Sequence, residues 1–187
     1  MQINWLFKQC SIVTPSITTL LILVFNLNIA CAEQSIVTKA RLQTKKINIE
    51  ITSHLGDTQS FVKGDVIKFL ISLDIDAYIT VIYQTVNQQF MQLLPNNKQK
   101  QTRYKSGLFI AVPSDDAAYR FTIAAPYGKE KVWVFASDKA IKPLPGKVLA
   151  NGIRQVAIDI KTIKNIVLKN SKNYFGVASF TLSTSAR

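Results

Sequence analysis

Histidine and cysteine often act as nucleophiles, proton carriers or metal ligands, and this chain of 187 residues has only one histidine and two cysteines. His54 stands at an expected strand end, close to Gly56 and Asp57. A catalytic triad needs a nucleophile and an orienting acid beside the histidine, and the sequence contains no Gly-x-Ser-x-Gly elbow. The usual zinc sites combine several cysteines and histidines. We therefore interpret His54 as a surface or turn histidine and expect no catalytic residue, no metal site and no cofactor.

Two close groups of carboxylates, Asp74-x-Asp76 and Asp115-Asp116, could supply oxygen ligands to a calcium ion. Calcium needs about six to eight such ligands, and no EF-hand or Gly-Asp repeat supplies the rest. Aspartates in turns commonly accept hydrogen bonds from nearby backbone amides, so we expect that role here. A carboxylate-based hydrolase stays open as a third hypothesis, because glycoside hydrolysis uses two carboxylates, but nothing singles out a pair.

The basic residues are the strongest candidates for a functional role. The formal net charge is +12 at pH 7. Four cations and a tyrosine gather in one expected polar loop: Lys98, Lys100, Arg103, Tyr104 and Lys105. Outside the cytoplasm such charge would meet anionic glycans or lipid headgroups, and not nucleic acid. The alternative is a solvated surface that keeps the protein soluble.

The N-terminal residues 1–32 have the pattern of a secretory signal peptide. Lys8 supplies the positive charge and Leu20–Phe25 a short apolar run, which falls well below the roughly 20 residues that span a bilayer. Ala30 and Ala32 are the small residues that a signal peptidase recognises, so we expect cleavage after Ala32. We expect the protein to be exported to the bacterial periplasm or cell envelope.

Cys31 offers an alternative, as the lipid-bearing cysteine of a lipoprotein, since Ala30 precedes it. Asn28 stands where a bulky aliphatic residue usually precedes such a site, which counts against this interpretation. Cleavage after Ala32 would remove both Cys10 and Cys31. The mature chain would then form no disulfide and contain no thiolate nucleophile.

Beyond a flexible leader expected over 33–46, the apolar pattern has a period close to two, which is typical of strands. The expected strands are short and regularly spaced, and lie at about 47–51, 66–73, 77–84, 90–94, 107–112, 120–124 and 131–137. The segment 77–84 lacks clean alternation, which indicates a central strand covered on both faces. We predict a mostly β protein, an antiparallel immunoglobulin-like β-sandwich with a C-terminal helix and a final strand.

The end of the domain changes character. A break at 142–146 contains two prolines, and apolar residues then recur at helical spacing, which predicts a helix over about 152–168. A strand at 156–160 is the alternative. The segment 174–183 returns to period two and is expected to close the sheet. We expect one β-sandwich-like domain over 47–187, with an oligomeric state that the sequence leaves open.

Turn signals punctuate the strands in a fixed order. The residues that we interpret as structural turns are Gly64, Asp65, Pro95, Asn96, Pro113, Pro126 and Gly128. Together with Phe61, with Tyr78 after Asp76, and with Leu93-Leu94 before Pro95, this series resembles the domain of unknown function DUF4384 over about 47–137. Leu94 departs from the aromatic residue that is more usual in the family.

The resemblance assigns no catalytic residue. It implies an accessory module, because the domain occurs in bacterial envelope and signalling proteins, sometimes fused to peptidases or kinases. We therefore expect a non-catalytic interaction module whose partner is another envelope protein. A binding protein for an anionic envelope glycan or lipid, acting through the basic loop, is the alternative.

Overall fold

The computed structural model describes residues 44–100 and 103–187. The expected signal peptide at 1–32, its cleavage residues Ala30 and Ala32, and the possible lipidation site Cys31 lie outside the described residues. The chain from Thr44 to Arg187 forms one compact unit.

Short strands make up most of this unit. In chain order they are β1 (Lys45–Lys46), β2 (Ile49–Ser53), β3 (Ser60–Val62), β4 (Val66–Ile67), β5 (Phe69–Leu73), β6 (Ala77–Gln84), β7 (Phe90–Leu94), β8 (Arg103–Tyr104), β9 (Ile110–Val112), β10 (Phe121–Thr122), β11 (Lys129–Ser137), β12 (Gly146–Val148), β13 (Arg154–Val156) and β14 (Tyr174–Ser185). The helix α2 (Ile160–Asn170) lies between β13 and β14.

The strands form two facing sheets and a small ribbon. The larger sheet has the order β1-β14-β11-β6-β7-β13-β12, with β3 also paired to β14 and β8 to β6. The smaller sheet is β2-β5-β9, and β4 pairs with β10 in the ribbon. The two sheets pack face to face with the buried core between them, which is the arrangement of a β-sandwich. The predicted β-sandwich with its helix and final strand is confirmed.

Two of the strand pairs depart from the expected antiparallel arrangement. Both involve β14, which pairs in parallel with β1 and with β3. In the first of these pairs, Lys45 lies opposite Tyr174. Residues 45–46 were expected within the flexible leader, but they form a strand because the start of β14 offers them an edge to pair with.

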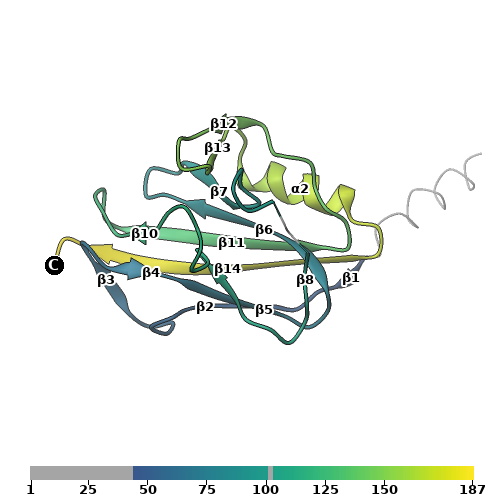
Figure 1. Cartoon of the computed structure of the whole chain (residues 1–187), viewed down its shortest axis with the longest axis horizontal. Coiled ribbons are helices and arrows are strands. Elements are labelled where there is room, and N and C mark those ends of the chain that lie inside the picture. Colours follow the sequence, from purple (N-terminus) through teal and green to yellow (C-terminus); the bar gives the residue numbers. More distant parts are fainter. Residues whose placement is uncertain (1–43, 101–102) are drawn as a thin grey trace, which may run out of the picture. The chain divides into compact units, whose positions relative to one another are not determined.

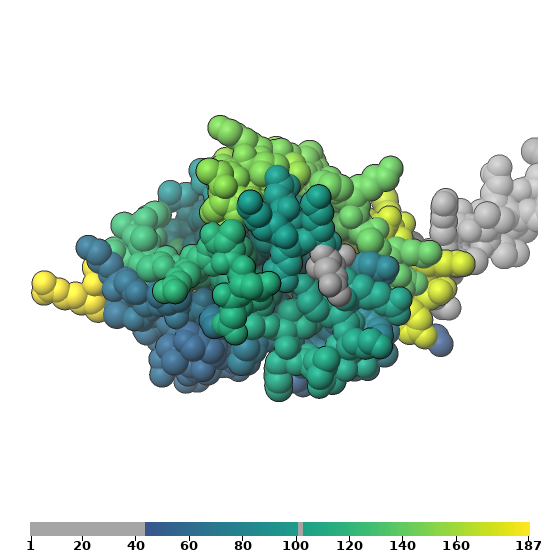
Figure 2. Space-filling view, in the orientation of Figure 1, coloured from purple at the N-terminus to yellow at the C-terminus, as the bar shows by residue number. Residues whose placement is uncertain are grey.

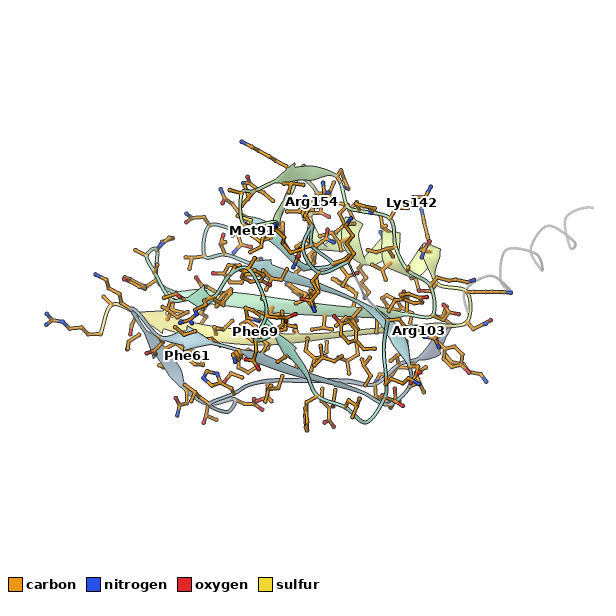
Figure 3. All side chains as sticks on the ribbon, viewed as in Figure 1. Phe61, Phe69, Met91, Arg103, Lys142 and Arg154 are labelled. Atoms are coloured by element: carbon orange, nitrogen blue, oxygen red, sulfur yellow. The ribbon has the colours of Figure 1, made fainter. Side chains whose placement is uncertain are left out.

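The sandwich has a third layer, since α2 covers the outer face of the larger sheet. In Figure 1 the layers run from α2 at the top, through β6, β11 and β14, to β2 and β5 at the bottom. The core between the sheets contains Phe61, Phe69 and Ile71 among its buried residues, and a second core lies beneath α2. Figure 3 places Phe69 near the middle of the sandwich.

Strand β6 shows why the central strand lacks alternation. Ile79 and Val81 are buried in the core between the sheets, while Ile82 is buried in the core beneath α2. Both faces are therefore covered, as the sequence pattern predicts. The bounds of β6 and β7 agree with the expected segments 77–84 and 90–94.

The structure corrects the start of the predicted helix, which begins at Ile160 and not near 152. Residues 154–156 form β13 because they find hydrogen-bonding partners on both sides, in β7 and in β12. The side chain of Asp159 caps the helix by accepting a hydrogen bond from the Thr162 N–H at 2.7 Å. Ile163 and Val167 then lie one helical turn apart and are buried against the sheet.

Candidate functional site

The turn at Gly64 and Asp65 ties two parts of the chain together. Gly64 has a φ of +93°, which a residue without Cβ adopts at low cost. Its N–H donates to the Ile123 carbonyl at 2.9 Å. The Asp65 carboxylate accepts from the Val62 N–H at 2.8 Å. These contacts join the β3–β4 turn to the end of β10.

Asn96 organises the loop that follows β7. This side chain is 9% exposed, and its Oδ1 accepts from the backbone N–H groups of Lys98 and Gln99 at 2.9 and 2.7 Å. Its Nδ2 donates to the Leu93 carbonyl at 2.8 Å. The preceding Leu94–Pro95 bond is cis, as are the bonds before Pro113 and Pro126. Among the turn residues expected from the sequence, Gly64, Asp65 and Asn96 thus make hydrogen bonds that hold their turns.

Gly128 anchors the last of these turns to the end of β14. Its N–H donates to the Thr184 Oγ1 at 2.9 Å, and its carbonyl accepts from the Thr184 N–H at 2.9 Å. The turn that opens β11 is therefore fastened to the strand beside it.

The residues of the expected basic loop do not share one setting. Lys98, Lys100 and Lys105 are exposed. Arg103 belongs to β8, where its guanidinium lies 3.9 Å from the Asp76 carboxylate and 5.9 Å from the centre of the Tyr78 ring. Figure 3 shows Arg103 toward the end of the sandwich opposite Phe61.

Tyr104 packs inward, against the core between the two sheets. Its hydroxyl accepts a hydrogen bond from the Gln99 Nε2 at 3.2 Å, and burial raises the pKa of Tyr104. The structure therefore separates this residue from the exposed lysines with which the sequence grouped it.

The remaining polar candidates have structural partners. His54 is exposed, and its Nδ1 accepts from the Lys68 N–H at 3.2 Å. Asp74 accepts from the Asn48 N–H at 3.0 Å, and Asp76 from the Ser106 N–H at 3.0 Å. That bond to Ser106 is the main cause that lowers the pKa of Asp76. Within the described residues no three His, Cys, Asp or Glu side chains are grouped to hold a metal ion.

The connection between β9 and β10 borders two hollows of the described surface. Residues 113–120 connect β9 to β10 and cross the face turned to the viewer in Figure 2. One hollow of about 390 Å³ lies beside Lys68, Asp115 and Arg120. Another, of about 240 Å³, lies across the segment toward β7 and β13. Asp115 forms an ion pair with Lys68, which lowers the pKa of Asp115 and fastens the segment to the sandwich.

The second of these, which we call the aromatic hollow, is the more apolar in its residues. Its lining includes Tyr83, Met91, Tyr119, Arg120, Phe121, Asn151 and Ile153. The rings of Tyr83 and Phe121 meet edge to face, with centroids 4.7 Å apart and planes at 89°. Figure 3 shows Met91 on the upper part of the sandwich, near β13.

A buried acid lies behind the aromatic hollow. The Tyr83 hydroxyl interacts with the carboxyl group of Glu130, which is 6% exposed and whose Oε2 has no hydrogen-bond partner. Burial raises the pKa of Glu130 and also that of Tyr83. A carboxyl group with a raised pKa can hold a proton close to the hollow, and no other carboxylate is buried within the described residues.

Sequence reasoning missed the hollow because its walls come from separate parts of the chain, which are β6, β7, the segment that ends in β10, and the connection between β12 and β13. The series Tyr119-Arg120-Phe121 places a cation between two aromatic residues and was the available local signal. The opposite wall, Leu149 to Ile153, depends on the pairing of β13 with β7. That pairing was hidden by the helical pattern of the same residues.

The fold defines a β-sandwich module with a helix on one face and a surface hollow that its own connecting segments build. Residues 60–140 match the family described as Domain of unknown function (DUF4384), so the chain is a DUF4384 domain-containing protein. The match runs from β3 to just beyond β11, a narrower span than the sequence suggested. No curated protein and no solved structure matches the chain. In the described part of the chain, none of the helices has the length and apolar character to cross a membrane.

Proposed function

We propose that this protein is a non-catalytic interaction module of the bacterial cell envelope that binds another protein through the aromatic hollow. The supporting observation is the combination of Tyr, Phe, Met and Arg side chains around one exposed depression. These residue types are enriched where proteins bind each other. The aromatic rings among them offer large apolar contact with few rotatable bonds. The export of the chain remains part of the proposal.

The size of the hollow fits one apolar side chain and its flanking backbone. A volume of about 240 Å³ is below the range of about 300–1,000 Å³ that is typical of small-molecule pockets. Arg120 and Asn151 are exposed at this hollow and could bind backbone carbonyls or a carboxylate of the partner. We therefore expect a protein segment with an apolar anchor.

Site-directed photo-crosslinking in intact cells tests the proposal. A photoreactive amino acid replaces Thr122 or Asn151, which are exposed and line the hollow, and as a control it replaces Lys161, an exposed residue of α2. We expect the same adduct from both hollow positions, no such adduct from the control, and its loss when Arg120→Glu is added. Equal adducts at all three positions would contradict the hollow as the binding site.

Glu130 offers the sharpest test against a non-catalytic role. Glu130 is the one buried carboxylate among the described residues. A carboxylate-based hydrolase would therefore have to use Glu130 or scattered surface acids. Saturable turnover of an envelope substrate that disappears in Glu130→Gln, in a protein that remains folded, would replace the interaction module with an enzyme.

The second candidate function is binding of an anionic envelope glycan or lipid through the basic loop. The exposure of Lys98, Lys100 and Lys105 favours it. Replacing these three lysines by serine should weaken retention on anionic envelope material and flatten its salt dependence. Retention that is unchanged at low salt would contradict this candidate.

A further inference from the structure

We infer that the outer face of the α2 layer binds a linear acidic glycan. Five exposed lysines make up this face, which we call the lysine face: Lys142, Lys161, Lys164, Lys169 and Lys172. The inference goes beyond the second candidate function, because it places an anionic glycan on other residues than those of the basic loop. It is independent of the aromatic hollow.

The lysine face is built from two segments that lie side by side. The connection between β11 and β12 runs along α2: its Ala140 carbonyl accepts a hydrogen bond from the Asn170 Nδ2 at 3.0 Å, and its Pro145 carbonyl accepts from the Ala157 N–H at 3.0 Å. Asn170 ends α2 and Ala157 lies just before its start, so the connection is fixed at both ends of the helix. Figure 3, viewed as in Figure 1, places Lys142 beside α2.

The burial of α2 directs its lysines outward. Ile163 and Val167 are buried against the larger sheet, whereas Lys161, Lys164 and Lys169 are exposed. Because a helix repeats every 3.6 residues, these three lysines lie on the side of α2 away from the sheet. The helix has 11 residues and is therefore about 16 Å long, so its charges are spread along a line and not gathered around one point.

The positive charge of this layer is not offset by acids. Residues 138–173 contain eight lysines and arginines but only two acids, Asp138 and Asp159. The Asp138 carboxylate accepts from the Lys172 and Asn173 N–H groups at 2.9 and 2.8 Å, and the Asp159 carboxylate caps α2. Among the described residues, none of the five lysines of the face forms an ion pair. Their charge is therefore open to a ligand.

The kind of cation and the groups between the cations favour a glycan. Lysine is a hydrated point charge without the rigid fork of arginine, so the face suits repeated anionic groups along a chain better than one carboxylate held at two points. Thr162 and Asn165 are exposed on the same helix, and their side chains can hydrogen-bond to sugar hydroxyls. No leucine, isoleucine or valine of residues 138–173 is exposed, so the face offers none of these side chains for insertion into a bilayer. An acidic glycan uses each of these features.

The experiment measures binding of the full chain to alginate, a linear polymer of carboxylated sugars, and to dextran, an uncharged glycan. Two triple variants are compared with the parent. The helix variant combines Lys161→Gln, Lys164→Gln and Lys169→Gln, and the loop variant combines Lys98→Gln, Lys100→Gln and Lys105→Gln. Each removes three exposed lysines, so the variants differ in the place of the lost charge and not in its amount. Glutamine is close to lysine in helix propensity, so α2 should remain folded.

We expect the parent to bind alginate and not dextran, with an affinity that falls steeply between about 50 and 200 mM salt. The helix variant should bind alginate about tenfold less tightly or worse and show a flatter salt dependence, because fewer counterions are released. The loop variant should bind like the parent. In NMR spectra of the parent, the backbone amide signals of α2 should shift when alginate is added, and those of β2 in the smaller sheet should not.

The outcomes separate the lysine face from the basic loop. If the loop variant loses alginate binding while the helix variant keeps it, the lysine face is overturned and the second candidate function stands. Equal losses in the two variants would also overturn the lysine face, because binding would then follow the net charge. If the parent prefers phosphatidylcholine vesicles with about 30 mol% phosphatidylglycerol over alginate, and the helix variant loses that binding, lipid replaces the glycan as the ligand. Unchanged urea midpoints confirm that the variants remain folded.

Discussion

The hydroxyl group of Tyr83 interacts with the buried carboxyl group of Glu130, at the point where the neighbouring strands β6 and β11 support the aromatic hollow. The Oε2 of this carboxyl group makes no hydrogen bond. The pair therefore joins the wall of the hollow to a group whose charge is costly to keep inside the sandwich. We therefore expect the free energy of unfolding to depend on the protonation of Glu130.

The first prediction concerns the pH dependence of folding. Burial raises the pKa of Glu130 above its ordinary value of 4.5, so the folded state binds the proton more tightly than the unfolded state does. The stabilisation from this proton is fully present while the pH is below the pKa of Glu130 in the unfolded state. It is lost as the pH rises through the pKa of Glu130 in the folded state. Glu130→Gln should remove that loss, and should be more stable than the parent at neutral pH. Urea unfolding from about pH 2 to about pH 8 measures it.

Asp159 provides the control of opposite sign. Its pKa is lowered by the hydrogen bond from the Thr162 backbone, so its contribution is present above the unfolded pKa and is lost as the pH falls through the folded pKa. Asp159→Asn should flatten the acid side of the stability curve only. If Glu130→Gln changed the same acid side, the raised pKa of Glu130 would be wrong.

The second prediction tests the helix as the third layer. Ile163 is 0% exposed and packs in the core that contains Ile82 and Phe135. Ile163→Ala should lower the free energy of unfolding by about 2–5 kcal/mol, because it leaves a cavity under α2. Lys161→Ala, on the exposed face of the same helix, should change it by less than about 0.5 kcal/mol. Equal effects would show that α2 does not pack as described.

The third prediction concerns a close approach of two strands. A Cβ added at Gly176 would lie 2.4 Å from the Ile47 carbonyl oxygen, and that oxygen belongs to backbone that cannot rotate away. Gly176→Ala should therefore cost about 1–3 kcal/mol in the free energy of unfolding by forcing β1 and β14 apart. Ser179→Ala, on an exposed position of β14, is the control. Calorimetric or urea unfolding of both variants gives the comparison.

The fourth prediction concerns Asn96 and the basic loop. Asn96→Ala removes the acceptor for the Lys98 and Gln99 amides and the donor to Leu93, and should cost about 1–3 kcal/mol in stability. Asn96→Asp keeps the acceptor and should cost less. Hydrogen exchange should show faster exchange at the Lys98 and Gln99 amides in Asn96→Ala. Unchanged protection there would mean that another contact holds the loop.

The sequence predicted β6 and β7 well because buried strands bounded by turns leave a local signature. It misplaced the start of the helix because Ile153 and Val156 satisfy both a helical period and a pair of strand contacts, and only the presence of β7 and β12 decides between them. The aromatic hollow could not be predicted from local sequence patterns, because it too depends on the pairing of β13 with β7. Tyr119 and Asn151 line the same hollow only after that pairing is made.

The basic loop was predicted as a group of like residues, and the structure divides it. The lysines remain on the surface, but Tyr104 is drawn inward because Ala77 pairs with it across β6 and β8. A strand of two residues is too short to show a period in the sequence. The sequence did not predict the exposure of Leu108 and Phe109, because leucine and phenylalanine in a predicted strand are expected to be buried in the core.

The place of β14 in the larger sheet has a kinetic consequence. Strand β14 is the last in chain order, yet it pairs with β1, β3 and β11. It therefore joins the two ends of the described domain. Folding must wait for this long loop to close, and sandwiches with such high contact order fold in about milliseconds to seconds. Until then the edge of β11 is unpaired. A chain emerging from a ribosome or a membrane channel would expose that edge to chaperones, proteases and other copies of itself for as long as its last strand is delayed.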